Sequence, residues 1–375
     1  RTGVHLAIWR WTDRDHGKDM IGAEQRMHHP TPHEVAIVFD KPWEGNGANY
    51  VTVFQDGPVY RMYYRGSHFD EASKAATHRE VTCYAESRDG VNWKKPELGL
   101  FEFEGSKANN IVWDGIGTHC FTPFKDANPD CAPEARYKAV ARGRPLGKKG
   151  LYIYKSPDAI HWTLMADEPA ITTGAFDSQN LAFWDSQRML YVSYHRNFVN
   201  GVRAIMTCTS EDFVKWTEPV YLEYGDAPNQ HLYTNAVMPY LRAPHLKVGF
   251  PTRYLPNEGS RVEPIFMISR DGLVFKRWNE ALIPEDAPED RNGNRSNYMT
   301  RGLLQLPGSD RELSVYATEA YYTGPDSRVR RFSFRVDGFV SVHGEAAGDT
   351  LLTRPFTFSG DQLVLNYQVA KKGSL

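Results

Sequence analysis

The sequence lacks most of the features that would assign it to a specialised class of protein. It has no apolar run near the eighteen or so residues that a membrane helix needs. Its 44 basic side chains nearly cancel its 46 acidic ones, which leaves a net charge of −2. We therefore expect no membrane partner and no nucleic-acid partner, because binding to either needs a feature that is missing here. With 41% hydrophobic residues, the chain is also too apolar to be disordered.

Signatures of metal, redox and nucleophile chemistry are missing too. The four cysteines, Cys83, Cys120, Cys131 and Cys208, form no CxxC pair. Cys120 and Cys131 could bridge a loop in an oxidising compartment, but we expect free, buried thiols. No GxSxG, HExxH or Walker motif occurs, which argues against serine hydrolase, zincin and P-loop chemistry. Neither a metal site nor a cofactor is predicted.

The first residue is Arg1, with no initiator Met and no apolar signal region. We treat this as a trimmed sequence and expect a periplasmic or extracellular location. Nothing in the sequence predicts the oligomeric state.

Aromatic residues and a repeat predict an all-β fold. The chain has 20 Tyr, 19 Phe and 9 Trp, which favour strands. A motif of Ser, then Asp two residues later, then an aromatic six residues from the Ser recurs about every sixty residues. Its four copies and one degenerate copy are SRDGVNW from Ser87, SPDAIHW from Ser156, SEDFVKW from Ser210, SRDGLVF from Ser269 and RVDGFVS from Arg335.

Each repeat matches one blade of a propeller. Alternating segments before the motif predict three strands, the motif predicts a tight turn, and a fourth outer strand completes the blade. The turn aromatic should pack between neighbouring blades. We predict a lead-in segment over 1–41, a five-bladed propeller over 42–353, and a tail or the start of a truncated β-sandwich over 354–375. A strand within the lead-in, EVAIVFD, either packs on the closing blade or fills a lid. Helical periodicity is weak, with a helix expected only around Asp70.

In a propeller, the start of the innermost strand and the end of the second strand line one mouth of the central funnel. The second strands of the five repeats end with aligned charged residues, namely Arg65, Arg142, Arg196, Arg253 and Glu319. Each arginine could simply form a salt bridge with a neighbouring blade. Together they would bind an anion such as a carboxylate or a sulfate on a sugar.

Acidic residues precede the innermost strands of the first three repeats. Asp177 is the best placed, Glu44 aligns more loosely, and Asp114 is weaker. Glycoside hydrolysis needs one carboxylic acid to protonate the departing oxygen and one carboxylate to activate water or attack the sugar. We predict Asp177 and Glu44 as this pair. The reserve acids are Glu80, Glu263 and Glu319, of which we include Glu319 among the predicted catalytic residues.

Other side chains near the mouth are predicted to bind substrate. The fourth repeat offers His231 and Tyr233 where the others offer an acid, and His195 precedes Arg196. Trp43 and Tyr233 could stack on sugar faces. The acids at the hairpins between first and second strands, Asp56, Asp126 and Asp185, fall on the opposite face and should be turn residues.

The repeated turns resemble those of the five-bladed propellers of glycoside hydrolase families 43 and 32 and their relatives. The resemblance covers about residues 40–353. It implies acids drawn from the first strands of successive blades, which carries over to Glu44 and Asp177 and more weakly to Asp114. It departs from the fructan-cleaving group, since the chain has no WMNDPNG-like start, no RDP and no EC pair. The residues from Arg354 are similar to the start of the β-sandwich that often follows such propellers.

These patterns favour a glycoside hydrolase acting near the end of an oligosaccharide or polysaccharide that carries acidic or sulfated sugars. A non-catalytic carbohydrate-binding propeller and a phosphorylase, in which the arginines hold inorganic phosphate, remain as alternatives. Two carboxylates within roughly 10 Å across the funnel would favour the enzyme.

Overall fold

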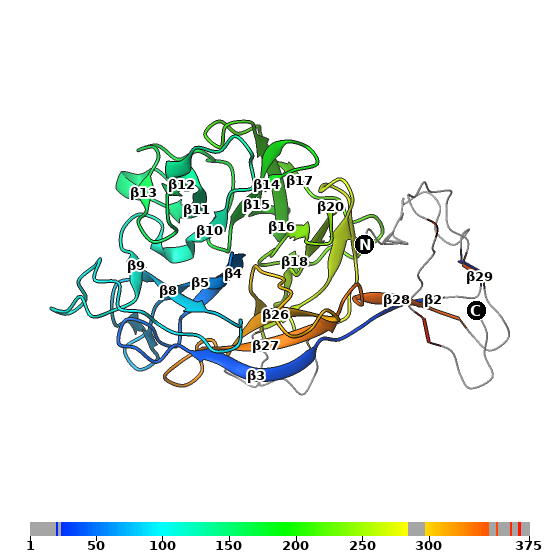
Figure 1. Ribbon diagram of the computed structural model, residues 1–375, viewed down its shortest axis with the longest axis horizontal. Helices are drawn as coiled ribbons and strands as arrows, with labels where there is room; N and C mark the ends of the chain where they lie inside the picture. Colours follow the sequence, from blue (N-terminus) through cyan, green and yellow to red (C-terminus); the bar gives the residue numbers. More distant parts are fainter. Residues whose placement is uncertain are drawn as a thin grey trace. The chain divides into compact units, whose positions relative to one another are not determined.

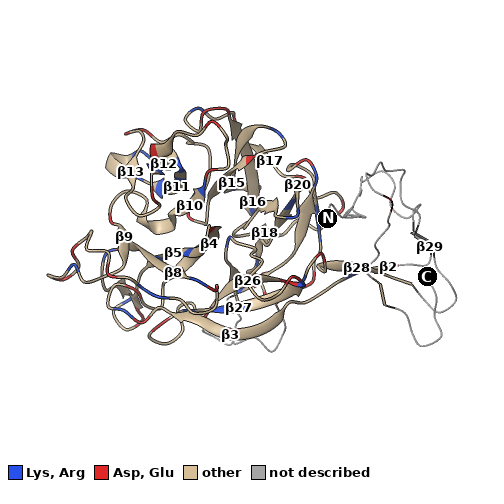
Figure 2. Cartoon of the chain, in the orientation of Figure 1, with Lys and Arg blue, Asp and Glu red and all other residues tan. Residues whose placement is uncertain are grey.

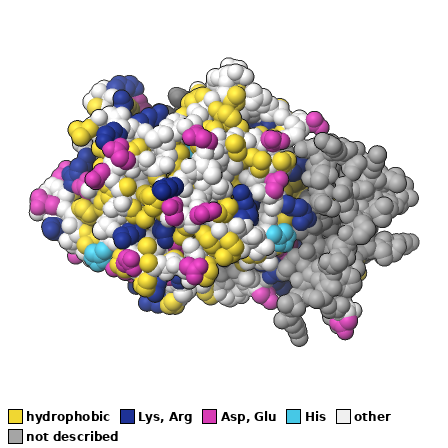
Figure 3. Space-filling model, turned by 90° about the horizontal axis from the view of Figure 1, so that it is seen from above, with side chains coloured by type: hydrophobic (Ala, Val, Ile, Leu, Met, Phe, Trp, Pro, Cys, Tyr) yellow, Lys and Arg dark blue, Asp and Glu magenta, His cyan; other side chains and the backbone are white. Residues whose placement is uncertain are grey.

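The protein is described from a computed structural model. It describes residues 20–21, 24–283, 297–344, 350–351, 361 and 367–368. These residues contain strands and three short 3-10 helices, with no α-helix. None of their helices is long and apolar enough to cross a membrane. Basic and acidic residues alternate along the chain (Figure 2) and are interspersed on the face seen in Figure 3, in keeping with the small net charge.

Five four-stranded antiparallel sheets form the compact unit of residues 29–336. The first sheet consists of β4 (Asn49–Asp56), β5 (Val59–Gly66), β8 (Val81–Ser87) and β9 (Ile111–Trp113). The second consists of β10 (Thr122–Lys125), β11 (Tyr137–Gly143), β12 (Gly150–Ser156) and β13 (Thr163–Leu164). The third consists of β14 (Leu181–Asp185), β15 (Leu190–Val199), β16 (Val202–Ser210) and β17 (Val220–Tyr221).

The fourth and fifth sheets depart from this simple order. The fourth consists of β19 (Met238–Tyr240), β20 (Ala243–Gly249), β23 (Met267–Ser269) and β24 (Phe275–Arg277). It is extended by a three-stranded sheet of β18 (His231–Leu232), β21 (Thr252–Leu255) and β22 (Arg261–Pro264). The fifth consists of β25 (Tyr298–Met299), β26 (Glu312–Glu319), β27 (Arg328–Arg335) and β3 (Thr31–Val38).

The repeated motif forms the predicted turn after the third strand. In the first copy, Asp89 Oδ1 accepts the backbone N–H groups of Val91 and Asn92 at 2.8 Å each, and Ser87 Oγ accepts that of Gly90 at 2.9 Å. The copies at Ser156 and Ser269 repeat this pattern, and in the copy at Ser210 the Asp212 carboxylate accepts the backbone N–H groups of Val214 and Lys215. These hydrogen bonds satisfy backbone N–H groups of the turn that have no partner in the sheet.

The turn aromatics pack between sheets, as the sequence predicts. Trp93 of the first sheet's turn meets Tyr316 of the fifth sheet edge to face at 5.9 Å between ring centres. Trp162 of the second sheet's turn meets Phe121 at 5.1 Å and Tyr63 of the first sheet at 6.3 Å. The hydrophobic core therefore consists of layers between neighbouring sheets.

The fifth sheet takes its outer strand from the other end of the unit. β3 pairs antiparallel with β27, so residues 31–38 pack on the last sheet, one of the two placements that the sequence left open. At its inner side, Arg301 donates its backbone N–H to Val51 at 3.0 Å and accepts that of Val53 at 2.7 Å. The fifth sheet thus adjoins the first, and Figure 1 shows the five sheets arranged around a common centre.

Two segments, around Asp70 and after β27, lie outside the five sheets. Residues around Asp70 form a small hairpin of β6 (Phe69–Asp70) and β7 (Ala75–Ala76), so the expected helix is wrong. The residues after β27 form β28 (Val340–His343), which pairs with β2 (Glu24–Met27), while β29 (Thr350–Leu351) pairs with β1 (Met20–Ile21). These strands belong to a second compact unit. The predicted tail or β-sandwich lies almost wholly outside the described residues.

Candidate active site

Asp177 is an exposed carboxylate in the segment just before β14. Its side chain is 56% exposed, and Oδ1 accepts a hydrogen bond from His119 Nε2 at 2.7 Å. Arg142 Nη1, at the end of the second strand of its sheet, lies 3.4 Å from the same oxygen. The His119 hydrogen bond, followed by the charges of His119, Arg142 and Arg196, holds the pKa of Asp177 well below its usual range. Asp177 is therefore ionised at neutral pH.

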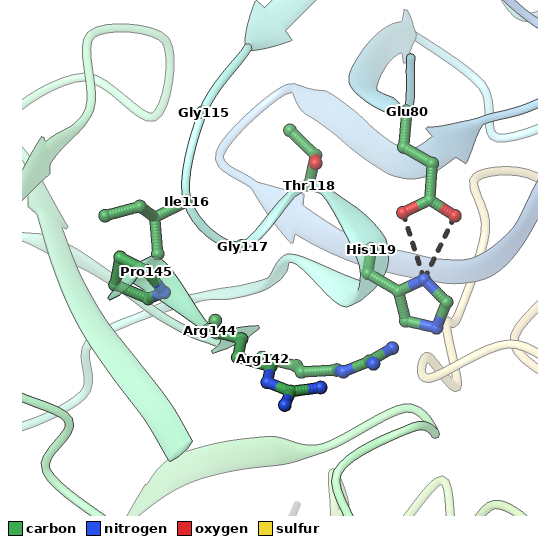
Figure 4. A pocket seen from close by; sticks show the side chains of 10 residues that line it. Glu80, Gly115, Ile116, Gly117, Thr118, His119, Arg142, Arg144 and Pro145 are labelled. Carbon is green, nitrogen blue, oxygen red and sulfur yellow. Dashed lines mark hydrogen bonds and ion pairs between the residues drawn. The ribbon is translucent and has the colours of Figure 1, made fainter. Parts of the chain in front are cut away.

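His119 connects Asp177 to a second carboxylate. It lies in η1 (Thr118–Cys120), and its Nδ1 is 3.0 Å from both carboxylate oxygens of Glu80, as Figure 4 shows. Burial alone would raise the pKa of Glu80, but the His119 hydrogen bond and the nearby positive charges hold it below its usual value. With both carboxylates ionised, the two ring nitrogens can both donate only if the imidazole is protonated.

A glycine fixes the loop that carries His119. Gly117, directly before η1, has φ +98°, and an added Cβ would lie 2.6 Å from Ala141 Cβ and from Tyr154 Oη. Both the backbone angle and the lack of space exclude other residues. The imidazole is consequently presented from a closely packed, fixed position.

A cavity of about 330 Å³ lies beside the Glu80–His119 pair. Its size is at the lower end of that of small-molecule sites. It is lined by Glu80, Gly115, Ile116, Gly117, Thr118, His119, Arg142, Gly143, Arg144 and Pro145. One carboxylate, one imidazole and two guanidinium groups thus border a space between the first two sheets (Figure 4).

Arg65 is a buried arginine beside Glu80. Only 4% of it is exposed, and Nη2 donates to Gly47 O at 2.7 Å and to Tyr321 Oη at 3.0 Å. Nη1 lies 3.5 Å from Glu80 Oε1. Arg65 therefore helps to hold Glu80 ionised, and most of its donors are used within the protein.

Arg196 is the third arginine at this mouth. It is 5% exposed, donates from Nε to Ala175 O at 3.1 Å, and keeps a buried Nη1 with no hydrogen-bond partner. Its Cζ lies 4.8 Å from the ring centre of Tyr233. Asp177, Arg65, Arg142, Arg196 and Tyr233, all expected near one funnel mouth, therefore lie in one region.

Glu44 does not join them. It is fully buried, with Oε2 2.6 Å from Lys95 Nζ, and Oε1 accepts from Tyr64 Oη at 2.5 Å. Burial raises its pKa despite the lowering effect of Lys95. Its contacts describe a structural ion pair, which differs from the predicted role beside Asp177.

Glu319 is also held by internal partners. Its side chain is fully buried, and it accepts from Arg328 Nε at 2.8 Å and from Arg330 Nε at 2.6 Å. Arg253 is likewise paired with buried Glu263 and donates from Nη1 to Asn279 O at 2.5 Å. Glu319 and Arg253 therefore both form salt bridges within the protein.

The remaining predicted binding residues lie in three different settings. Trp43 donates from Nε1 to Asn110 Oδ1 at 2.6 Å and packs in the core. His195 is fully buried, donates from Nε2 to Thr173 O at 3.1 Å, and burial lowers its pKa to about 4. His231 is partly buried beside Arg203.

Sequence reasoning missed His119 and Tyr50. His119 lies three residues before β10, much as Asp177 lies four before β14, so counting back from the innermost strand would have found it. Tyr50 has φ +55°, a strained angle for a tyrosine, and its ring centre lies 4.9 Å from Arg65 Cζ and 5.6 Å from that of His119. The sequence gives no signal for that strain.

Among the described residues, no group of three or more His, Cys, Asp or Glu side chains could hold a metal ion. The four cysteines are free thiols, and three of them are buried.

No family model and no curated protein matches the chain. Solved structures do match, with low identity. A glycoside hydrolase is 14% identical with a TM-score of 0.55, covering 88% of this chain and 96% of that one. A thermostable family-43 glycoside hydrolase is 13% identical with a TM-score of 0.54, covering 84% and 97%. A β-1,2-mannobiose phosphorylase from Listeria innocua, in complex with β-1,2-mannobiose, is 12% identical with a TM-score of 0.55, covering 84% and 97%. The chain is thus structurally similar to five-bladed propeller glycoside hydrolases and phosphorylases.

Proposed function

We propose that the protein is a five-bladed propeller glycoside hydrolase that cleaves a sugar from the end of an oligosaccharide or polysaccharide. The observation that carries this proposal is the series of contacts Glu80–His119–Asp177, of which Glu80 and His119 line the cavity. Two carboxylates on opposite nitrogens of one imidazole are roughly 7 to 8 Å apart, within the range of acid and base pairs of inverting glycosidases. A non-catalytic binder would not need this arrangement.

Asp177 is the proposed base. Its lowered pKa keeps it ionised, and its exposed position lets it reach a water molecule next to the sugar.

Glu80 is the proposed acid, recharged through His119. A sugar that fills the cavity removes water from Glu80, which favours the neutral carboxyl group. The proton then moves from His119 Nδ1 to Glu80 and from there to the departing oxygen, while the proton of the attacking water passes to Asp177. Asp177, which is 56% exposed, then releases this proton to solvent, and His119 Nδ1, left without a hydrogen, takes up a proton from solvent, which restores the starting state.

Asp177→Asn tests the proposal. The variant should lose turnover of glycosides by about 10²-fold or more, while its far-ultraviolet circular dichroism spectrum stays that of wild type. Asp130→Asn, an exposed aspartate in the loop before η2 (Pro133–Ala135), is the matched control. Wild-type rates in Asp177→Asn would reject the assignment.

A glycoside phosphorylase is the second candidate. Arg142 and Arg144 both line the cavity, and two guanidinium groups could hold inorganic phosphate where a hydrolase holds water. The test is sugar release with and without phosphate. Release that requires phosphate and yields a sugar phosphate would favour the phosphorylase over the hydrolase.

A further inference from the structure

Two arginines of the third sheet contact the same pair of aromatic rings. Arg196 Cζ lies 4.8 Å from the ring centre of Tyr233 and 5.6 Å from that of Phe198. Arg203 Cζ lies 5.4 Å from both of these ring centres and 4.8 Å from that of Tyr254. The two positive charges are therefore held close together by stacking against shared rings.

Neither guanidinium forms an ion pair with a carboxylate in the part of the chain that the structure describes. Each also has a buried N–H with no hydrogen-bond partner, at Nη1 of Arg196 and at Nε of Arg203. Arg196 is 5% exposed, so water satisfies it poorly. Since buried charges are normally paired, the two guanidinium groups lack a directly bonded negative group.

Arg253, at the equivalent position of the next repeat, has an internal carboxylate partner. It is 8% exposed and pairs with buried Glu263 through both Nε and Nη2. The Arg196–Arg203 pair has no such internal carboxylate, and an anionic ligand would supply the same interaction.

His231 adds a third donor. Its Nδ1 accepts the backbone N–H of Arg203 at 3.2 Å, so Nε2 carries the hydrogen of the neutral ring. Burial, followed by the charge of Arg203, lowers the pKa of His231 and keeps the ring neutral. The polar groups of Arg196, Arg203 and His231 that remain available are therefore donors.

The cluster belongs to the same mouth as Asp177. Arg196 donates from Nε to Ala175 O at 3.1 Å, two residues before Asp177, and its charge lowers the pKa of Asp177. A ligand held here would lie next to the sugar on which Asp177 acts.

We propose that Arg196, Arg203 and His231 form a subsite for an anionic substituent of the sugar, a carboxylate or a sulfate ester, beside Asp177. This subsite rests on the proposed function for its sugar. Its anion-binding chemistry can be tested apart from any turnover. Carboxylate and sulfate both present several acceptor oxygens to the planar donors of arginine.

Calorimetric titration of the whole protein with glucuronic acid, glucose 6-sulfate and glucose tests the proposal. Wild type should bind at least one anionic sugar about tenfold or more tightly than glucose, since hydrogen bonds to charged groups are stronger than neutral ones. Arg203→Gln should lose that preference, and Arg203→Lys should recover only part of it, because an ammonium lacks the planar fork. Arg136→Gln, at an exposed arginine, should behave as wild type. The sugar that binds distinguishes a carboxylate from a sulfate.

Equal binding of all three sugars by wild type, or equal binding by Arg203→Gln and wild type, would overturn the subsite. Far-ultraviolet circular dichroism checks that Arg203→Gln folds, and Arg203→Lys provides the comparison if it does not. Arg203-dependent binding of an anionic sugar by a protein that cleaves no glycoside would refute the hydrolase and leave the subsite standing. Cleavage of neutral glycosides at equal rates by wild type and Arg203→Gln, without any preference for anionic sugars, would refute only the subsite.

Discussion

His119 Nε2 lies 2.7 Å from Asp177 Oδ1, although the two residues belong to segments that precede different sheets. Each precedes the innermost strand of its own sheet, so the contact exists only because those two strands start at the same mouth. The other nitrogen of the same ring contacts Glu80, which precedes a third strand. One imidazole therefore contacts two carboxylates from other segments of the chain, one before β8 and one before β14.

The first prediction concerns this imidazole. His119→Gln should lower kcat by about 10²- to 10⁴-fold, because an amide cannot supply a proton to Glu80. KM should change far less, since Arg142 and the cavity remain. The pH dependence of kcat should also flatten, a change that a merely structural role would not cause. His161→Gln, at an exposed histidine of a repeat turn, is the control. Wild-type kcat in His119→Gln would contradict the proposed proton transfer from His119 to Glu80.

The second prediction is stereochemical. Because the imidazole separates the two carboxylates by roughly 7 to 8 Å, a water molecule fits on the opposite side of the sugar from the acid, which leads to inversion. Proton NMR recorded during the first minutes of hydrolysis should show the anomer opposite to that of the substrate. Initial release of the retained anomer would mean that the acting carboxylates lie closer together than Glu80 and Asp177.

The third prediction separates stability from activity at Glu44. Glu44→Gln leaves Lys95 facing a buried amide and should lower the free energy of unfolding by about 3 kcal/mol in urea titrations. Its kcat should stay at the wild-type value. Asp40→Asn is the matched control, because Asp40 contacts the same ammonium at 3.0 Å but is 55% exposed and should change stability by less than about 1 kcal/mol. A stable Glu44→Gln variant without activity would restore Glu44 to the catalytic role that the sequence predicted.

The sequence predicted the positions that depend on the repeat. The Ser-x-Asp turn marks the end of each third strand, and counting back from it placed Arg65, Arg142 and Arg196 near one mouth. The repeat spacing does not show which arginine pairs with an internal carboxylate. Arg253 does so because β22, which contains Glu263, pairs with β21.

The loops before the innermost strands were harder to predict because their lengths vary. Asp114 and His119 both precede β10, but Asp114 pairs with Arg79 at 2.8 Å, whereas His119 contacts Glu80 and Asp177. The strand EVAIVFD, residues 34–40, was predicted, and β3 occupies residues 31–38. Its pairing with β27 is one of the two placements that the sequence left open, because these hydrogen bonds form between the two ends of the unit.

The last prediction concerns His195, which is fully buried and has a pKa lowered to about 4. In the unfolded chain its pKa is about 6.5, so between these values the unfolded state binds a proton that the folded state does not. The free energy of unfolding should therefore fall as the pH is lowered from about 6.5 toward 4, by up to about 3 kcal/mol from this residue. Above pH 6.5 the residue adds no pH dependence.

Urea unfolding of wild type and His195→Gln at pH 7.5 and pH 5 measures this effect. The amide of glutamine can keep the hydrogen bond to Thr173 O but does not titrate, so the variant should lose less stability on acidification than wild type. Comparing the two proteins removes the contributions of the other titrating groups, among them Glu44, whose raised pKa acts in the opposite direction. An equal loss in both proteins would show that His195 accepts a proton in the folded state, and that the interior around Thr173 is more open to water than its burial indicates.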